Sequence, residues 1–402
     1  MFKKMGVLTK LLLGIVIGII IGLVSKSLNF YVIVRLLNTF STLFGTFLNY
    51  TIPLIIIAFV AQGIAELGNK SGKLLGITVV VAYASTIFAG MLAFLVGITV
   101  LPHLLKGGTA VAKSTVYLEP FFNIQVDPIM GVMTALVTAF VLGIGMAYIK
   151  EKNMYKVTCD LKKIVELIVK NVIITGVPIY ICGIFAKLSA SGDIIRTLKA
   201  FSAVYVIILP LQVLTIIIQY TAAWVVSGKS PIKCIKNMLP GYLTAVGTQS
   251  SAATIPVNLQ CAKNNNVSDK IADFVIPLCA TIHLAGDTIT LVVGAMGIMI
   301  ISGKMPTAGM MIPYIFMLGI TMIAAPGIPG GGAYAALGLL KDMLMFNSGQ
   351  QGLMIAIHFA QDSFGTATNV CGDGAIALII DKIFKNENKE SALDDNLKVE
   401  NF

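Results

Sequence analysis

Charged side chains are scarce in this sequence. Only 12% of its 402 residues are Asp, Glu, Lys or Arg, whereas 56% are hydrophobic, and the mean hydropathy is +0.88. Soluble domains carry about twice this fraction of charge. Runs without any charged residue exceed the roughly 20 residues that a membrane-spanning helix needs, for example at 36–65, 74–105 and 305–340. The composition therefore predicts a protein that crosses a membrane several times.

The sequence also lacks the short segments of alternating polar and apolar residues that build a membrane β-barrel. Its apolar runs are continuous, so we predict helical spans near 8–29, 33–65, 74–105, 128–149, 164–188 and 198–227. No small-residue cleavage pattern follows the first run, so we expect an uncleaved span there rather than a signal peptide.

No two cysteines have the CxxC spacing of a metal or redox site. The six cysteines lie mostly in apolar sequence, so we predict packed thiols rather than disulfides or metal ligands. The net charge of +10 does not indicate nucleic-acid binding, because the lysines lie in short loops between spans. Their distribution predicts a multi-pass protein of the bacterial inner membrane with both termini in the cytoplasm.

Two apolar stretches in the C-terminal half are too interrupted to be simple spans. Residues 239–263 contain the polar cluster Gly247–Ser251, and residues 306–341 contain a run of Pro and Gly at 326–332. Proline and consecutive glycines break helices, and non-helical backbone survives at membrane depth only where it is buried or lines a cavity. Each stretch is predicted to be a re-entrant helical hairpin, and such a pair is typical of a transporter site.

The last predicted span carries four polar residues, Asp362, Thr366, Asn369 and Asp373, at spacings that place them on one helix face. Two carboxylates in one span cost about 2.5–3.5 kcal/mol each, so they must meet a cavity, a cation or an amine, unless they cap a helix end or pair structurally. Asn369 and Asp373 offer hard oxygen ligands suited to Na⁺. Asp362 lies three turns away, where it can hold a substrate ammonium group.

Two further motifs carry polar groups into apolar sequence. His283 and Asp287 are four residues apart, so we expect them to share a helix face. Such a pair either moves a proton or holds a local geometry. The first hairpin tip begins with Ser250 and Ser251, and its hydroxyls and free backbone N–H groups near a helix start suit a carboxylate.

In this order, the two hairpins and the acidic last span resemble the dicarboxylate/amino acid:cation symporter family. The first hairpin, at 250–258, is most similar to that of bacterial serine/threonine symporters. The resemblance covers the chain and implies an all-α polytopic membrane protein of the elevator type, a homotrimer with eight transmembrane helices and two re-entrant hairpins. It implies scaffold helices at 1–73, a transport-domain span and outer loop at 74–127, two scaffold spans and one transport span at 128–227, a transport core at 235–385 and a loosely ordered cytoplasmic tail at 386–402.

The resemblance also assigns site residues. Asp362 is expected to hold the substrate amino group, and Ser251 and Asn369 its α-carboxylate. The implied substrate-binding set is Ser250, Ser251, Gly327, Gly330, Asp362, Gly365, Thr366 and Asn369. The implied Na⁺-binding set is Cys279, Thr281, His283, Ala325, Asn369 and Asp373, with backbone oxygen supplied near Cys279, Thr281 and Ala325.

The departures from the family pattern concern the substrate and the ions. Gly365 stands where members with acidic substrates carry an Arg, and Gln249 offers no replacement cation, which argues against glutamate, aspartate or dicarboxylates. His283 and Ala285 replace the Asn and Asp of an additional Na⁺ site. We therefore expect fewer Na⁺ per cycle, or a proton carried through His283 and Asp287.

These features predict a secondary active symporter that imports a small neutral amino acid, serine- or threonine-like, together with Na⁺. The alternative is an H⁺-coupled or mixed Na⁺/H⁺ symporter of the same fold for another amino acid or a carboxylate. An intramembrane enzyme is disfavoured because no nucleophile–base pair or facing acids are evident. A channel would favour a continuous pore over paired broken hairpins.

Overall fold

The computed structural model describes residues 7–68, 72–105, 118–149, 151–323, 325 and 329–399, and all regular secondary structure in these ranges is helical. The helices are α1 (Val7–Ser27), α2 (Val32–Ile56), α3 (Gln62–Gly68), α4 (Gly72–Leu104), α5 (Val132–Tyr148), α6 (Asn153–Ile168), α7 (Ile174–Ser191), α8 (Ile194–Ser227), α9 (Pro231–Thr248), α10 (Ser251–Asn264), α11 (Asp269–Ile282), α12 (Ala285–Ile301), α13 (Ala308–Met322), α14 (Gly331–Leu344) and α15 (Ser348–Val399). Two π-helical turns, η2 (Ile57–Ala61) and η3 (Val169–Ile173), join α2 to α3 and α6 to α7.

The chain is an all-helical membrane protein. Within the described residues, seven helical segments are long and apolar enough to cross a membrane: Thr9–Ser27, Val32–Ala65, Gly72–Leu104, Asn153–Ser191, Ile194–Ser227, Asp269–Ile301 and Ser348–Lys385. The span expected at 128–149 corresponds to the shorter helix α5. Large apolar side chains face outward on α1 and α8, as expected for surfaces that meet lipid.

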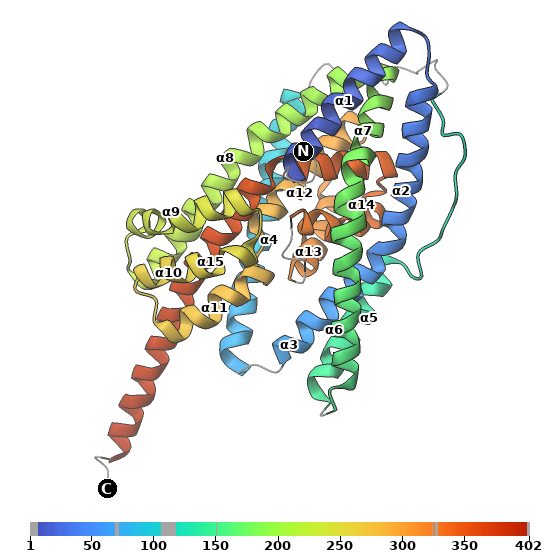
Figure 1. Cartoon of the computed structure of the whole chain (residues 1–402). Helices are drawn as coiled ribbons and strands as arrows, with labels where there is room; N and C mark the ends of the chain where they lie inside the picture. Colours follow the sequence, from blue (N-terminus) through green and yellow to red (C-terminus); the bar gives the residue numbers. More distant parts are fainter. Residues whose placement is uncertain are drawn as a thin grey trace.

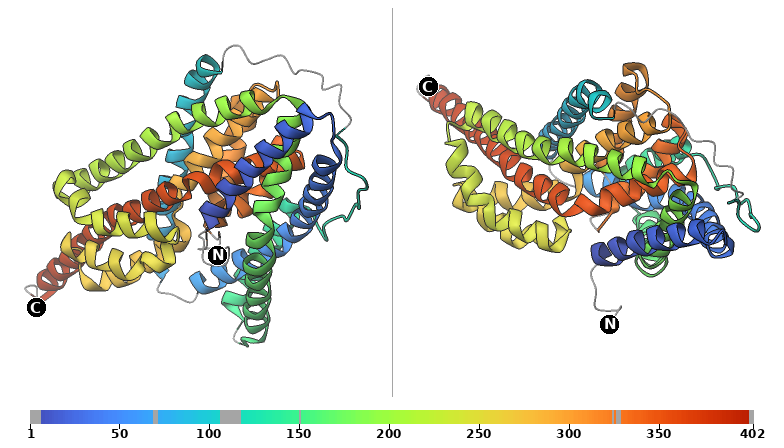
Figure 2. Two further views of the ribbon diagram at one scale, coloured as in Figure 1. Left: turned by 45° about the horizontal axis from the view of Figure 1, so that its top comes forward. Right: turned by 90° about the horizontal axis from the view of Figure 1, so that it is seen from above.

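The helices form two groups. In the first, α1 and α2 pack on α7, and α5 packs on α3. In the second, α4, α8 and the helices from α9 to α14 pack around α12 and α15. Figures 1 and 2 show α15, in red, running through the middle of the second group, while α1, in dark blue, lies on the outside of the molecule against α7. The movement of one group against the other stays a prediction.

A row of glycines brings α1 close to α7. Gly14, Gly18 and Gly22 recur every fourth residue on one face of α1. A Cβ atom at Gly14 would lie 2.5 Å from the carbonyl oxygen of Pro178, and one at Gly18 would collide with the carbonyl oxygen of Cys182. Because apolar burial drives little association between helices in lipid, small residues that allow close backbone approach stabilise such a contact.

The interior is densest around α12. Every residue of α12 from Ala285 to Ile300 is buried, as is most of α15 from Gly352 to Ile380. All six cysteines are free thiols, and five of them are buried as expected of packing residues, whereas Cys159 is partly exposed. Polar side chains enclosed at this depth must be hydrogen-bonded or bind something, because burying a polar group without a partner costs free energy.

Both interrupted stretches form helical hairpins. In the first, α9 and α10 pack on each other and meet at Gln249, whose φ of +52° is left-handed, and at Ser250, whose side chain accepts a hydrogen bond from the N–H of Ala253. In the second, α13 and α14 pack on each other, and α14 begins after Gly330. Gly327, in the tip of the second hairpin, lies outside the described residues.

The seventh span is broken in the middle, which sequence analysis did not predict. Helix α11 ends at Ile282 and α12 begins at Ala285, with His283 and Leu284 out of helical conformation between them. The expectation that His283 and Asp287 share one continuous helix face is therefore wrong. Their side chains bond instead to different residues of α15, His283 to Asp373 and Asp287 to His358 and Asn369.

The C-terminal segment also differs from its expectation. Residues 386–399, expected to be loosely ordered, continue α15 as a helix that extends beyond the rest of the molecule (Figure 1). Extending an existing helix avoids the cost of nucleation, so a polar segment that would not start a helix continues this one.

Candidate functional site

The two hairpin tips meet α15 and the break in the seventh span around a small polar cavity. Its lining residues are Gln249, Ser251, Ala280, Leu284, Asp287, Ala325, Gly331, Gly332, Asp362, Thr366 and Asn369. None of these described lining residues is Lys or Arg. The cavity measures about 20 Å³, room for about one water molecule. An amino acid would therefore enter only if the surrounding segments move apart.

Asp362 lies on the α15 side of this cavity and is 3% exposed. Its Oδ2 accepts a hydrogen bond of 2.9 Å from the backbone N–H of Gly330, and Thr366 Oγ1 lies 3.4 Å from its Oδ1. Gly330 has a φ of +75°, and a Cβ atom there would collide with the ring of Phe359. Only glycine fits this position, and it places the start of α14 directly against the carboxylate, where the positive end of the helix dipole is favourable.

Asn369 connects α15 to the start of α12. Its Oδ1 accepts a hydrogen bond of 2.7 Å from the N–H of Gly286, and its Nδ2 donates one of 2.5 Å to Asp287 Oδ2. This side chain thus satisfies backbone that the break after Ile282 leaves without a helical partner. Asn369 lines the cavity, but its Oδ1 already accepts the hydrogen bond from Gly286.

His358, which sequence analysis missed, bonds to the other oxygen of Asp287. Its Nε2 lies 2.6 Å from Asp287 Oδ1, and the imidazole is fully buried. The signal was present, because His358 precedes Asp362 by four residues and extends the polar face of α15 by one turn. Potential ligand atoms of Asp287, His358 and Asp362 lie within 4.8 Å of one another. The nitrogen and the carboxylate are hydrogen-bonded directly to each other, so we interpret the group as a His–Asp pair rather than a metal centre.

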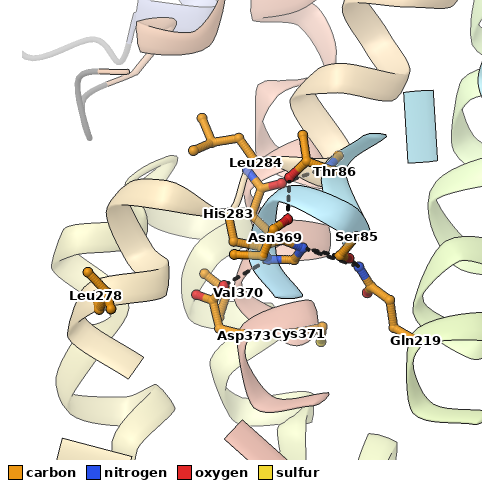
Figure 3. A network of polar contacts seen from close by, with 12 residues as sticks. Ser85, Thr86, Gln219, Leu278, His283, Leu284, Asn369, Val370, Cys371 and Asp373 are labelled. Atoms are coloured by element: carbon orange, nitrogen blue, oxygen red, sulfur yellow. Dashed lines mark hydrogen bonds and ion pairs between the residues drawn. The ribbon is translucent and has the colours of Figure 1, made fainter. Parts of the chain in front are cut away.

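A second buried pair involves His283 and Asp373. His283 Nδ1 lies 3.0 Å from Asp373 Oδ1, and its Nε2 lies 3.0 Å from Ser85 Oγ and 3.3 Å from Gln219 Nε2. Figure 3 shows the imidazole between Asp373 on one side and the Ser85 and Gln219 side chains on the other. The network joins α4, α8 and α15 at the break in the seventh span.

Part of this network is suited to a monovalent cation. Asp373 is fully buried, and its Oδ2 has no hydrogen-bond partner among the described residues. Helix α11 ends beside it, and the last carbonyls of a helix lack intrahelical partners. The carbonyl of Cys279 accepts the N–H of His283 at 2.9 Å. A buried carboxylate oxygen without a hydrogen-bond partner, close to the end of a helix, fits a hard cation such as Na⁺.

The other predicted residues lie in different surroundings. Ser251 and Ala325 line the cavity, and Ser250 caps α10. Thr281 is exposed and donates to the carbonyl of Leu278. Gly365 does not line the cavity. A Cβ atom there would lie 3.1 Å from Gln361 Nε2 and 3.6 Å from Gln212 Nε2, so this position faces α8.

Comparison with known proteins supplies independent information. The family model described as the sodium:dicarboxylate symporter family matches residues 7–383. Human excitatory amino acid transporter 2 is 25% identical over 256 residues, covering 62% of this chain and 44% of the relative. Mouse excitatory amino acid transporter 5 is 31% identical over 165 residues, which are 41% and 29% of the two chains. Human excitatory amino acid transporter 1 is 28% identical over 221 residues, which are 53% and 39%. The matched parts thus span about half or less of these relatives' length.

Proposed function

This chain belongs to the sodium:dicarboxylate symporter family, and from that premise we propose that it is a Na⁺-coupled symporter for a small neutral amino acid. The observation that carries this proposal is the cavity between the two hairpin tips, in which the buried carboxylate of Asp362 is the partner for a substrate ammonium group. Binding at the membrane midplane between broken helices is how many secondary transporters hold their substrate.

A neutral substrate fits the cavity better than the dicarboxylates in the family's name. A second carboxylate on the substrate would need a buried cation, for which an Arg side chain is best suited. The described lining holds Asp287 and Asp362 and no Lys or Arg. Gly365 stands where members with acidic substrates carry an Arg. It faces α8, and it supplies no cation for a second substrate carboxylate.

The proposed Na⁺ site is formed by Asp373 and the last carbonyls of α11, near Cys279. The unpartnered Oδ2 of Asp373 supports this assignment. His283 contributes as a donor that holds the other carboxylate oxygen, not as a ligand. A second site using backbone near Thr281 and Ala325 rests on the family resemblance alone.

His283 and Asp287 bond to different partners rather than to each other, which does not support the expected proton path through this pair. We therefore propose Na⁺ as the coupling ion. Uptake into liposomes that responds to an imposed Na⁺ gradient, and not to an imposed pH gradient at saturating Na⁺, is the expected result.

The test of the substrate site is uptake of radiolabelled serine by purified protein in liposomes. We expect Asp362→Ala to abolish uptake, because the ammonium group loses its only charged partner among the residues proposed to bind it. Asp342→Ala is the matched control, because this acid near the end of α14 lies outside the cavity lining. Uptake by Asp362→Ala equal to that of the unsubstituted protein contradicts the proposal.

The proposal extends to the assembly and its surroundings. We propose a homotrimer in a bacterial inner membrane, with both termini cytoplasmic. Exposed large apolar side chains on α1, α5 and α8 support contacts with lipid and neighbouring subunits. Native mass spectrometry of the detergent-extracted protein and protease accessibility of a C-terminal tag in sealed vesicles test these two points.

A further inference from the structure

The cavity contains a second carboxylate, Asp287, that binding of an ammonium group by Asp362 does not require. It lies in the first turn of α12 and lines the cavity together with Asp362 of α15. A Cβ atom on Gly332 would lie 3.0 Å from its Oδ1, so the carboxylate also touches the start of α14. Asp287 therefore stands where α12, α14 and α15 meet, beside the proposed ammonium site.

Two donors fix the orientation of this carboxylate. His358 Nε2 lies 2.6 Å from Oδ1, and Asn369 Nδ2 lies 2.5 Å from Oδ2. An ionised carboxylate offers about four acceptor positions, so these two bonds leave acceptor capacity on both oxygens. The His358 nitrogen that faces Asp287 carries the proton, because a carboxylate only accepts. The group is thus rigid, buried and still able to accept a hydrogen bond.

The charges in the cavity define what the second carboxylate can bind. A single ammonium group compensates one of the two acids, the described lining holds no Lys or Arg for the other, and His358 supplies Asp287 with one hydrogen bond from outside the lining. A substrate hydroxyl that donates to Asp287 would be favoured, since hydrogen bonds to charged acceptors are stronger than neutral ones. A side-chain carboxylate would face Asp287 directly and be repelled, and a methyl group would leave this acceptor unpaired.

The spacing of the two acids fits one class of amino acid. Ligand oxygens of Asp287 and Asp362 lie within 4.8 Å of each other. Two donors on adjacent carbon atoms, the α-ammonium and a β-hydroxyl, can each reach one of them. Resting on the proposed function, we propose that Asp287 is a specificity-determining residue that recognises the β-hydroxyl of serine or threonine, with His358 as its positioning residue.

The experiment compares pairs of substrates that differ in the hydroxyl. Uptake of serine against alanine, and of threonine against valine, is measured in liposomes for the full chain and its Asp287→Asn and Asp287→Ala variants. The unsubstituted protein is expected to prefer the hydroxyl substrate in kcat/KM. Asp287→Ala is expected to lower that preference by about 10-fold or more, the effect of one hydrogen bond to a charged group.

Variants of His358 separate positioning from structural support. His358→Gln retains an N–H donor for Asp287 and is expected to retain most of the preference, whereas His358→Leu is expected to lose it. Asp381→Asn is the matched control, because Asp381 is a buried acid of α15 that bonds to Ser268 and Lys385 outside the cavity. It is expected to leave the serine-to-alanine ratio unchanged.

The outcomes are distinguishable. An unchanged serine-to-alanine ratio in Asp287→Ala overturns the inference and leaves the proposed function standing. Equal uptake of aspartate and serine by the unsubstituted protein overturns both the inference and the neutral substrate. Absence of uptake of every neutral amino acid overturns the proposed function as well. If an Asp287 variant elutes as aggregate on size exclusion, the ratio in His358→Leu and calorimetric binding of serine and alanine to His358→Gln decide the question.

Discussion

Buried acids on α12 and α15 each have a compensating donor. A charge in the hydrocarbon region is costly, and an unpaired buried carboxylate would be expected to destabilise the fold. Asp362 accepts a backbone N–H from Gly330, Asp287 accepts from His358 and Asn369, and Asp373 pairs with His283. Each of these carboxylates can still accept a further hydrogen bond, which a binding site requires.

At this residue scale, His283→Leu is expected to destabilise the protein. The substitution leaves Asp373 Oδ1 without its partner and removes the acceptor or donor that faces Ser85. A buried polar group left unsatisfied costs about 1–3 kcal/mol, more if charged. Thermal unfolding of the purified protein in detergent measures this as a lower Tm. His103→Leu, at an exposed histidine near the end of α4, is the control, and equal Tm values for both variants would contradict the role given to His283.

At the scale of elements, close backbone approach determines where helices meet. The glycine row of α1 meets α7, and at Gly286 a Cβ atom would collide with the carbonyl oxygen of Gly365, which brings α12 against α15. Apolar side chains pack around both contacts, but the backbones approach most closely at these glycines. Both depend on the absence of a side chain, so single substitutions are expected to have large effects.

Gly18→Leu is expected to separate α1 from α7 and lower the Tm, because its side chain would occupy the place of the Cys182 carbonyl. The matched control is Gly76→Leu, a helical glycine of α4 with nothing within 4 Å of its Cβ position. Thermal unfolding and the yield of monodisperse protein report the difference. Equal Tm values for the two variants would show that the α1–α7 contact contributes little.

Gly330→Ala tests the start of α14, the second helix of the second hairpin. Left-handed backbone costs a non-glycine residue about 1–2 kcal/mol, and here the added Cβ also collides with the Phe359 ring. We expect lower stability and loss of serine uptake, because the N–H that faces Asp362 is displaced. Gly303→Ala is the control, since Gly303 has a φ of +80° with open space around it. Gly303→Ala is expected to lower the Tm only by the cost of left-handed backbone and to retain serine uptake.

At the scale of the whole molecule, ion and substrate binding are expected to be coupled. The proposed Na⁺ site at Asp373 and the cavity at Asp362 lie on one helix, α15, and Asn369 between them contacts the start of α12. If Na⁺ strengthens substrate binding, substrate must strengthen Na⁺ binding by the same factor.

We therefore expect serine and Na⁺ together to raise the Tm by more than the sum of their separate effects, since the stabilisation by each ligand grows as its Kd falls and each ligand lowers the Kd of the other. Choline in place of Na⁺ should abolish the extra stabilisation, and Asp373→Asn should do so without removing the effect of serine at high concentration. Strictly additive shifts would argue that the two sites are independent.

Much of this architecture was predictable from local patterning. Uninterrupted apolar runs predicted the spans, the Pro and Gly clusters predicted two hairpins, and the 3.6-residue period brought Asp362, Thr366, Asn369 and Asp373 onto one face of α15. These features depend only on neighbours within a few residues, so they can be read without knowing which helices meet.

The partners of the polar groups could not be predicted in this way. His283 was assigned to Asp287 because they are four residues apart, but the helix breaks between them, and each bonds across the core to α15. The spacing of His358 placed it on the polar face of α15, but its partner Asp287 became evident only when α12 was placed against that face. Which faces come together depends on the packing of helices distant in sequence, where glycines allow close approach and buried donors must find acceptors, and this the linear order of residues does not specify.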